Sequence, residues 1–160
     1  MRVVVLADTH VRRGGRKVLP QAAVAHLRTA EAILHAGDVL EGWFLDNLAE
    51  VAPVHAVLGN NDVDLDLPER LQVELAGVRI GMVHDSGSRR GREARLARWF
   101  PGCDLVVFGH SHVPLDVRGL GQRLLNPGSP TDKRTQPHHT LALLDLDDGR
   151  VRKTRIVELD

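Results

Sequence analysis

The sequence predicts an α/β protein in which mixed β-sheets are flanked by helices. In the first half of the chain, short apolar runs alternate with segments of helical spacing, whereas the second half consists mainly of paired strands around glycine-containing turns. Fragments rich in His, Asp and Asn follow most of the apolar runs. These fragments therefore lie where open α/β sheets usually build their functional sites, at the carboxyl ends of strands.

The first half of the chain alternates strands with helices. Its opening apolar run is continuous, as expected for a strand that is buried on both faces. In the helical segments, apolar side chains recur every three or four residues. We expect strands over Val3–Ala7, Ala32–Ala36 and Val54–Leu58, and helices over Val18–Ala30 and Trp43–Val51.

The second half is richer in strands and in tight turns. The Ala76-Gly77 and Asp148-Gly149 dipeptides are typical of hairpin turns, and Gly119-Leu120-Gly121 serves the same purpose. A basic helix and a further buried strand separate the first two hairpins. The expected elements are the hairpins Leu71–Leu75 with Val78–Val83, Leu115–Arg118 with Arg123–Asn126 and Thr140–Leu146 with Val151–Leu159, the helix Arg92–Phe100 and the strand Leu105–Phe108. The outer hairpin strands leave edges that could pair in a homo-oligomer, a state that the sequence leaves open.

Length and composition predict one domain over residues 1–160, with 42% hydrophobic residues. Lys and Arg total 21, as do Asp and Glu, so the formal net charge of +0 gives no reason to expect a nucleic-acid or membrane partner. No apolar run approaches the length of a membrane span. Cys103 is the only cysteine, which excludes an internal disulfide, and we expect a cytoplasmic location.

The chemistry lies in six polar fragments that share a preference for metal-binding side chains. Taken singly, each has an ordinary explanation, because Asp and Asn favour turns and a lone His is usually structural. Together they offer carboxylate, imidazole and amide oxygen, which suit Mn, Fe, Zn or Ni. They are Asp8-Thr9-His10, Gly37-Asp38, Gly59-Asn60-Asn61-Asp62, His84, Gly109-His110-Ser111-His112 and Asn126-Pro127-Gly128-Ser129. The set predicts a site for two metals, and hence phosphoester hydrolysis.

Local geometry explains why these residue types suit such a site. Asp8 and His10 are two residues apart, so in extended chain both side chains face the same side. Gly37 lets the chain turn sharply and expose the carboxylate of Asp38. Imidazoles gathered at two strand ends repel one another when charged and favour a cation between them. We interpret the other histidines (His26, His55, His138 and His139) as structural, His35 as packed in the core or behind the ligands, and Cys103 as a packing residue.

The order and spacing of these fragments resemble the calcineurin-like metallophosphoesterase superfamily. The pattern of that family is D-x-H, GD, GN-x-D/E, H and GH-x-H, and here it covers residues 8 to 112. The short chain and the trailing Asn-Pro-Gly-Ser are similar to its small bacterial and archaeal phosphodiesterase branch. The resemblance implies a four-layer α-β-β-α sandwich with two mixed β-sheets, and a metal-dependent phosphodiesterase.

The resemblance also implies a role for each matching residue. The first metal would be held by Asp8, His10, Asp38 and His112, and the second by Asp38, Asn60, His84 and His110. Asp38 would bridge the two ions together with a hydroxide that attacks phosphorus. Catalytic roles would fall to Asn61, Asp38 and His112, and the cofactors would be two divalent ions, with manganese favoured over nickel, iron or zinc.

Two positions depart from the family pattern. Asn61 stands where the superfamily often has a His that is thought to protonate the leaving group. Because an amide cannot act as an acid, we expect a preference for good leaving groups such as aryl esters, or a hydrogen bond from Asn61 to a phosphoryl oxygen. Asp85 follows His84 where small residues are usual, and its carboxylate could hold a group behind the ligands or narrow the choice of substrate.

Alternative functions share the same fold. One is a phosphomonoesterase or nucleotide phosphatase, and another is a non-catalytic protein-binding scaffold similar to a retromer subunit. All the ligand positions carry competent residues, which favours an enzyme acting on a small phosphoester. Arg12, Arg13, Arg89 and Arg90 lie in loops after ligand-bearing strands, where they either guide an anionic substrate or form ordinary solvated surface.

Overall fold

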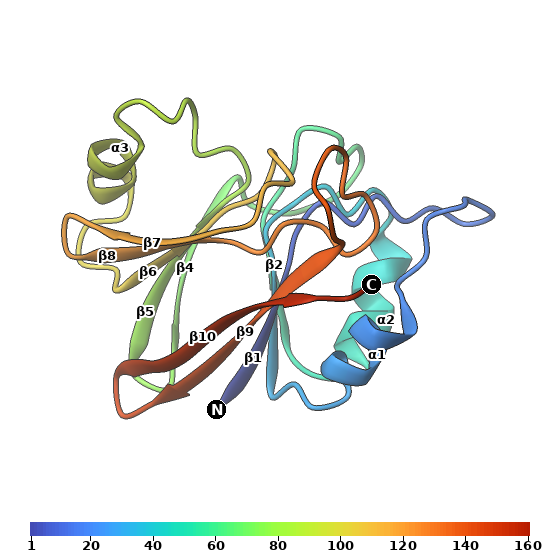
Figure 1. The fold of residues 1–160 in the computed structure, drawn as a ribbon, viewed down its shortest axis with the longest axis horizontal. Helices are drawn as coiled ribbons and strands as arrows, with labels where there is room; N and C mark the ends of the chain where they lie inside the picture. Colours follow the sequence, from blue (N-terminus) through green and yellow to red (C-terminus); the bar gives the residue numbers. More distant parts are fainter.

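Two five-stranded β-sheets lie face to face in the computed structural model, which describes residues 1–160 in full (Figure 1). The strand order is β10-β9-β1-β2-β3 in the first sheet and β4-β5-β6-β8-β7 in the second. Both sheets are mixed, because parallel pairs at the centre are extended by antiparallel hairpin strands. The predicted α/β class with two mixed sheets is therefore confirmed.

The observed elements follow the predicted ones closely. The first sheet contains β1 (Arg2–Leu6), β2 (Ala32–His35), β3 (Val54–Ala56), β9 (Thr140–Asp147) and β10 (Arg150–Glu158). The second contains β4 (Arg70–Leu75), β5 (Val78–Val83), β6 (Leu105–Val107), β7 (Leu115–Gly119) and β8 (Gln122–Asn126). The helices are α1 (Gln21–Leu27), α2 (Gly42–Ala49) and α3 (Arg92–Trp99).

The first helix is shorter than the expected Val18–Ala30. Pro20 occupies its N-cap with φ −57° and ψ 149°, and the helix proper begins one residue later. A proline forces the residue before it out of helical backbone, so Leu19 cannot continue the helical spacing that the sequence shows. At the other end, the backbone N–H of Thr29 bonds to the His26 carbonyl, which tightens the chain into a turn after α1.

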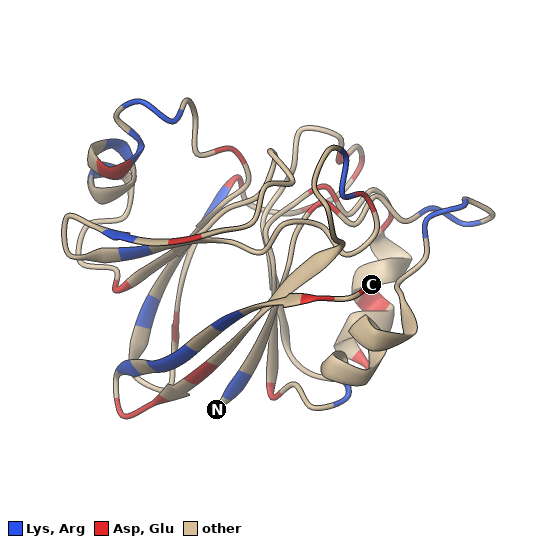
Figure 2. Cartoon of the chain, viewed as in Figure 1, with Lys and Arg blue, Asp and Glu red and all other residues tan.

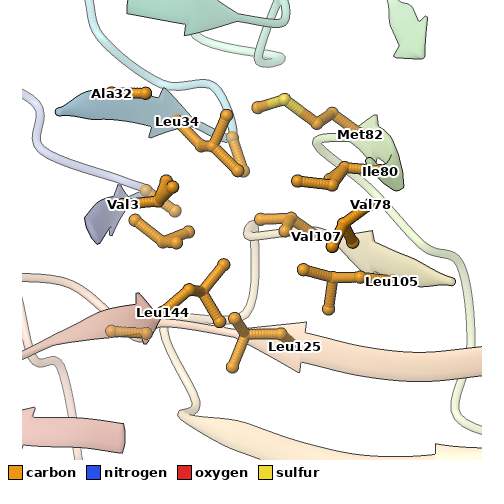
Figure 3. Close-up of a cluster of buried hydrophobic side chains, with 14 of the residues drawn as sticks. Val3, Ala32, Leu34, Val78, Ile80, Met82, Leu105, Val107, Leu125 and Leu144 are labelled. Atoms are coloured by element: carbon orange, nitrogen blue, oxygen red, sulfur yellow. The ribbon is translucent and has the colours of Figure 1, made fainter. Parts of the chain in front are cut away.

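The central core lies between the two sheets (Figure 3). Val3, Leu34 and Leu144 from the first sheet face Ile80 and Leu105 from the second, and all five are fully buried. Because successive strand residues point to opposite faces, the alternate residues of the same strands face outward, toward the helices. The two sheets are thus joined by a largely apolar layer.

The helices complete the outer layers. Phe44 and Leu48 of α2 pack with Leu6 and Ile33 on the outer face of the first sheet, together with α1. Leu96 of α3 packs in a separate cluster on the outer face of the second sheet. The architecture is the four-layer α-β-β-α sandwich that the resemblance implied. None of the three helices combines the length and the apolar character needed to cross a bilayer.

The three hairpins share one kind of turn. In each, both central residues have positive φ, as in the type I′ turns that match the twist of antiparallel strands. These pairs are Ala76-Gly77 (48° and 77°), Leu120-Gly121 (50° and 79°) and Asp148-Gly149 (48° and 69°). The sequence placed all three turns correctly because glycine accepts this backbone readily.

The parallel strands position the polar fragments. Each of the six fragments follows one of the parallel strands β1, β2, β3, β5, β6 and β8, or lies at its end. The loops after these strands gather at one end of the sandwich (Figure 1). Residues that are more than a hundred positions apart in sequence are therefore brought to one place.

The packing of α3 provides a test of this fold. Gly81 in β5 lies under the ring of Phe100, and an added Cβ would stand 2.5 Å from its Cγ. We expect Gly81→Ala to lower the free energy of unfolding by about 1–3 kcal/mol, because the core is overpacked there. The control is Gly42→Ala at the start of α2, where the nearest atom would be at 3.5 Å. That change should leave stability unaltered or raise it by up to about 1 kcal/mol, since alanine is the better helix former. Urea denaturation of both variants makes the comparison, and equal losses would contradict it.

Candidate metal centre

All seven predicted ligands lie at the end of the sandwich where the loops gather. The first sheet contributes three of its loops and the second sheet contributes two. Asp8 and His10 follow β1, Asp38 follows β2, Asn60 follows β3, His84 follows β5, and His110 and His112 follow β6. The structure thus brings every one of these side chains together, although they are separated by up to 104 positions (112 − 8) in the chain.

The two carboxylates lie at the centre of the cluster. Asp38 Oδ2 is 3.4 Å from His10 Nε2 and 3.5 Å from His84 Nε2. Asp8 Oδ1 is 3.5 Å from His112 Nε2 and 3.9 Å from His84 Nε2. Two groups of side chains could hold a metal, and within each group the ligand atoms all lie within 4.8 Å of one another. One group is Asp8 with His10 and His112, and the other is Asp8 with Asp38 and His84. Both carboxylates therefore lie between imidazoles of the two predicted ligand sets.

The remaining ligands close the other side of the cluster. Asn60 Oδ1 is 2.9 Å from His84 Nε2 and 3.0 Å from His110 Nδ1. The His84 and His110 rings meet edge to face with centroids 5.2 Å apart. An amide oxygen and two imidazole nitrogens thus converge beside Asp38, as the second predicted ligand set requires.

Backbone carbonyls orient two of the histidines. His84 Nδ1 donates to the Ala36 carbonyl at 2.7 Å, and His112 Nδ1 donates to the Asp132 carbonyl. A carbonyl can only accept, so Nδ1 of each ring carries a proton, and in the neutral ring Nε2 presents a lone pair to the cluster. This is the arrangement by which proteins fix a metal-binding histidine through its other nitrogen.

Unpartnered buried atoms show that the cluster fits a cation. Asp8 Oδ2, His10 Nε2 and His112 Nε2 are all buried and have no hydrogen-bond partner within the protein. Buried polar atoms are rarely left in this state, because losing water without a replacement is costly. One carboxylate oxygen and two imidazole nitrogens are also a donor set that divalent transition metals favour. The residues present therefore suit a divalent metal ion.

Burial and hydrogen bonding give the two carboxylates opposite protonation behaviour. Burial, reinforced by the nearby charge of Asp38, raises the pKa of Asp8 to about 8. Burial also opposes ionisation of Asp38, but hydrogen bonds from the backbone and side chain of Asn61 outweigh it and lower the pKa of Asp38. Burial lowers the pKa of His10 and of His112, which keeps both imidazoles neutral and able to ligate.

Unusual backbone accompanies the ligands. Five of the seven have positive φ: Asp8 (54°), His10 (47°), Asp38 (57°), His110 (69°) and His112 (59°). A residue other than glycine in this region costs on the order of 1 kcal/mol and persists only where its surroundings hold it there. Such strain clusters at functional sites, and here it turns each ligand inward directly after its strand.

Asp62 holds two of the ligand loops together, a role that the sequence did not reveal. Its Oδ2 accepts hydrogen bonds from the backbone N–H groups of Asp38 (3.0 Å) and Gly59 (2.7 Å), and its Oδ1 accepts one from Leu40 (2.7 Å). The carboxylate thus joins the loop after β2 to the loop after β3. The presence of Asp62 in the third fragment was the only signal, and without coordinates the residue reads equally well as a turn residue.

The Asn126–Ser129 fragment performs a similar task across the two sheets. Asn126 Nδ2 donates to the Gly109 carbonyl at 2.9 Å, and Ser129 Oγ donates to the Asp8 carbonyl at 2.8 Å. These bonds tie the loop after β6 to the loop after β1. This fragment therefore supports the ligand loops and supplies none of the predicted ligands.

Two glycines permit the loops to approach one another. An added Cβ at Gly59 would lie 2.1 Å from the backbone nitrogen of Asp38, and one at Gly109 would lie 2.9 Å from Asp8 Oδ2. Both distances are too short for real atoms, so only glycine fits at these positions. The glycine that precedes a ligand in the family pattern is thus required here by close packing.

Asn61 contacts the predicted bridging carboxylate. Its backbone N–H donates to Asp38 Oδ1 at 2.9 Å, and its side-chain Nδ2 donates to Asp38 Oδ2 at 2.7 Å. In this structure the side-chain amide of Asn61 therefore orients Asp38, and its expected effects on the leaving group and on a phosphoryl oxygen stay predictions. Asp85 lies beside the cluster, with its Oδ2 3.9 Å from His110 Nε2.

Residues interpreted as structural lie outside the cluster of ligand atoms. His35 is completely buried, with Nε2 3.0 Å from Thr9 Oγ1, and burial lowers its pKa to about 3. Cys103 is a buried free thiol in the core beneath α3. His138 and His139 contact Asp160 at the far end of the chain.

The basic loop residues divide into two kinds. Arg12 lines a cavity with His10, and Arg89 lines another with Ser111, so both border the ligand loops. Arg13 instead lies over the Trp43 ring, 5.5 Å from its centroid. Arg90 lines neither cavity.

This sandwich, with acid, imidazole and amide side chains gathered at the shared end of two mixed sheets, has the features of a metallophosphoesterase. The chain belongs to the calcineurin-like phosphoesterase superfamily, whose domain matches residues 1–149. A probable metallophosphoesterase of Methanocaldococcus jannaschii is 36% identical over 153 residues, which are 92% of this chain and 77% of that protein. The resemblance to the small branch of this family, inferred from motif order, is confirmed.

Solved structures share the architecture. Vps29 of Entamoeba histolytica, in a complex with Zn²⁺, is 26% identical with a TM-score of 0.79, and the match covers 100% of both chains. An archaeal phosphodiesterase is 17% identical with a TM-score of 0.74 over 99% of this chain and 100% of that chain, a likeness of fold alone. The fold therefore occurs both in a vacuolar protein sorting protein and in a phosphodiesterase.

The raised pKa of Asp8 predicts a cost in stability for the metal-free protein. The pKa of Asp8 in the folded chain is about 8, against an ordinary value of 3.8, so folding favours the protonated form. The stability difference between Asp8→Asn and the parent should therefore be small near pH 4 and grow as the pH rises toward 8. At pH 8 we expect the variant to be more stable by about 1–3 kcal/mol, by urea denaturation in EDTA.

The same pair of proteins tests metal binding. Added Mn²⁺ should stabilise the parent, because a ligand that binds only the folded state raises the unfolding free energy. It should leave Asp8→Asn unchanged. The control is Asp148→Asn in the exposed final turn, which should behave as the parent does. If Asp8→Asn were less stable than the parent at every pH in EDTA, the expected stability cost of the Asp8 carboxylate would be contradicted.

The role of Asp62 predicts a loss of both order and metal affinity. Asp62→Ala leaves three backbone N–H groups without their acceptor. We expect Mn²⁺ affinity to fall by about 10–100-fold, as for other residues that position ligands, by isothermal titration calorimetry. Asp64→Ala removes a neighbouring exposed carboxylate and should change affinity less than about twofold, since a surface charge is screened by solvent. Equal effects of the two changes would refute a positioning role.

Proposed function

We propose that this protein is a dinuclear, metal-dependent phosphodiesterase that acts on a small phosphodiester. Membership of the superfamily makes it a metallophosphoesterase, a hydrolase with a metal centre. The observation that carries the finer proposal is the pair of overlapping ligand groups that share Asp8, with Asp38 Oδ2 between His10 and His84. A carboxylate in that position can contact two cations, one on each side.

The proposed ligand sets are those expected from the sequence. Asp8, His10, Asp38 and His112 would hold the first ion, and Asp38, Asn60, His84 and His110 would hold the second. Divalent ions in such a site lower the pKa of a water molecule and neutralise charge on the phosphoryl oxygens. Manganese remains the favoured ion, with nickel, iron and zinc as alternatives, because imidazole and carboxylate together accept all four.

The protein's own contribution is positioning. His84 and His112 present fixed Nε2 lone pairs, because their Nδ1 protons are held by backbone carbonyls. Asn61 fixes both oxygens of Asp38 through two hydrogen bonds. Such preorganisation costs no rearrangement when the reaction occurs, which is where electrostatic catalysis gains most.

Two separate cavities support a diester over a monoester. One, of about 360 Å³, is lined by His10, Arg12 and Arg16, and the other, of about 640 Å³, is lined by Ser111, Arg89 and Arg92. Each shares residues with a loop that carries ligands. A phosphodiester has two ester arms to place beside the metals, whereas a monoester has one.

A protein-binding scaffold is the competing function, and the likeness to Vps29 motivates it. Because that relative was crystallised with Zn²⁺, metal binding alone cannot separate the two functions. Turnover is the property that does. The complete set of ligands in this chain supports an enzyme.

The decisive experiment combines metal analysis with activity. We expect two ions per chain after loading with Mn²⁺, and turnover of bis(4-nitrophenyl) phosphate that exceeds turnover of 4-nitrophenyl phosphate, with Ni²⁺, Zn²⁺ and Mg²⁺ compared in parallel. Asp38→Asn should lose at least about a hundredfold in kcat, the scale expected when one preorganised electrostatic group is lost. His55→Ala, outside the cluster, serves as the control. Metal uptake without turnover would favour the scaffold, and faster monoester turnover would favour a phosphomonoesterase.

Asn61 predicts the dependence on the leaving group. Asn61→His supplies an acid where the amide has none, and general acid catalysis typically contributes about 10²–10⁴-fold. We expect a larger gain in kcat for alkyl esters, which are poor leaving groups, than for nitrophenyl esters. Asn61→Ala controls for the loss of the side-chain hydrogen bond to Asp38, because it keeps the backbone one, and it should slow both kinds of ester alike. Equal changes on both esters for Asn61→His would contradict this role.

A further inference from the structure

We propose that the cavity between α3 and the β7–β8 hairpin binds one ester arm of the substrate, and that it selects an arm combining a flat apolar group with a negative charge. This inference rests on the proposed phosphodiesterase function and names the class of substrate. The cavity has a volume of about 640 Å³, within the usual range for small-molecule sites.

The cavity borders the loop that carries two of the predicted metal ligands. Ser111, which lines it, lies between the predicted ligands His110 and His112. Phe108, also in the lining, directly precedes Gly109 of the same loop. A group bound in the cavity would therefore lie beside the loop that carries His110 and His112, within reach of an ester arm of a phosphoryl group bound there.

One side of the cavity is apolar. Phe108 and Leu124 form its floor and are both only 1% exposed. Val113 and Val117 stand at its rim, 44% and 39% exposed, and they are among the few large apolar side chains that this protein leaves in water. A ring lying against these side chains would remove apolar surface from water, which is favourable.

The other side carries unpaired positive charge. Arg89, Arg92 and Arg118 line the cavity, and none of them forms an ion pair. By contrast, Arg123 pairs with Asp116 on the neighbouring hairpin at 2.7 Å. Arg92 lies over the Phe108 ring, 5.1 Å from its centroid, and its buried Nε has no hydrogen-bond partner. A guanidinium whose Nε is buried without a partner is a ready site for an anion, because it can bind a carboxylate or phosphate through two parallel hydrogen bonds.

The surrounding charges favour the same ligand. Glu93 is the only acid in the lining, and it makes no ion pair with these arginines. An added Cβ on Gly119 would be 2.3 Å from Glu93 Cδ, so the Glu93 side chain packs against β7. Figure 2 shows the positive charge gathered on α3 and on the loop before it. In a chain with a formal net charge of +0, this is a local excess.

A pair of matched diesters tests the selection. 4-Nitrophenyl phenyl phosphate and 4-nitrophenyl 4-carboxyphenyl phosphate release the same nitrophenolate and differ only in the charge of the retained arm. With the Mn²⁺-loaded full chain, we expect kcat/KM for the carboxylated diester to be about tenfold higher, the scale of one charged hydrogen bond. Arg92→Met keeps the packing on Phe108 and should abolish that preference. It should lower kcat/KM for the carboxylated diester about tenfold more than kcat/KM for the neutral diester, since only the carboxylated arm loses a charged hydrogen bond. Arg98→Met, on the exposed side of α3, should behave as the parent does.

A binding measurement without turnover separates the two proposals. In the metal-free protein, 4-methoxybenzoate should shift the NMR amide signals of Ser111, Val113 and Val117, and neither Arg92→Met nor the neutral analogue 4-methoxybenzyl alcohol should reproduce the effect. Equal kcat/KM for the two diesters and no 4-methoxybenzoate shifts would overturn the arm site while leaving phosphodiesterase activity intact. No turnover of either diester would overturn the phosphodiesterase, and the role of the cavity as an ester-arm site with it.

Discussion

The structure depends on two acidic side chains that are buried beside each other. Asp8 and Asp38 are 0% and 1% exposed, and no lysine or arginine forms an ion pair with either of them. Neutral imidazoles, an amide and backbone N–H groups surround them instead. Such an arrangement is unfavourable for folding alone, since buried charge requires compensation. It becomes reasonable when a cation supplies that compensation, and the supporting loops can be understood as the means of keeping the two carboxylates in place.

That support comes from residues that do not reach the ligand cluster themselves. Asp62 ties the second and third loops of the first sheet, whereas Asn126 and Ser129 tie the loop after β6 to the loop after β1. Together these bonds hold ligands in left-handed backbone that they would not adopt in isolation. The centre is therefore a property of the whole set of loops, and the two sheets act as the rigid base on which that set is built.

Much of the fold and of the candidate site could be predicted from sequence because the signals are local. Strand runs, glycine turns and polar fragments after strands each depend on a few adjacent residues, so Val3–Ala7 and the Asp148-Gly149 turn were placed nearly as observed. The role of Asp62, the tautomers of His84 and His112, and the contact of Asn61 with Asp38 all depend on partners from other loops. The same holds for Arg92, whose unpartnered nitrogen is visible only once Phe108 lies beneath it. The helical spacing of apolar residues also predicted too early a start for α1, because Pro20 fixes where that helix begins.

The division of the ligands between the two sheets has a mechanical consequence. The apolar layer between the sheets resists their separation through contacts without direction, whereas hydrogen bonds between the sheets, such as those of Ser129 to Asp8 and of Gly149 to Ala76, lie in the loops and turns outside that layer. An ion held jointly by Asp38 and His84 would add a further link between the two sheets at one end of that layer. Release of the ion would then remove one of the links between the two sheets at this end of the sandwich.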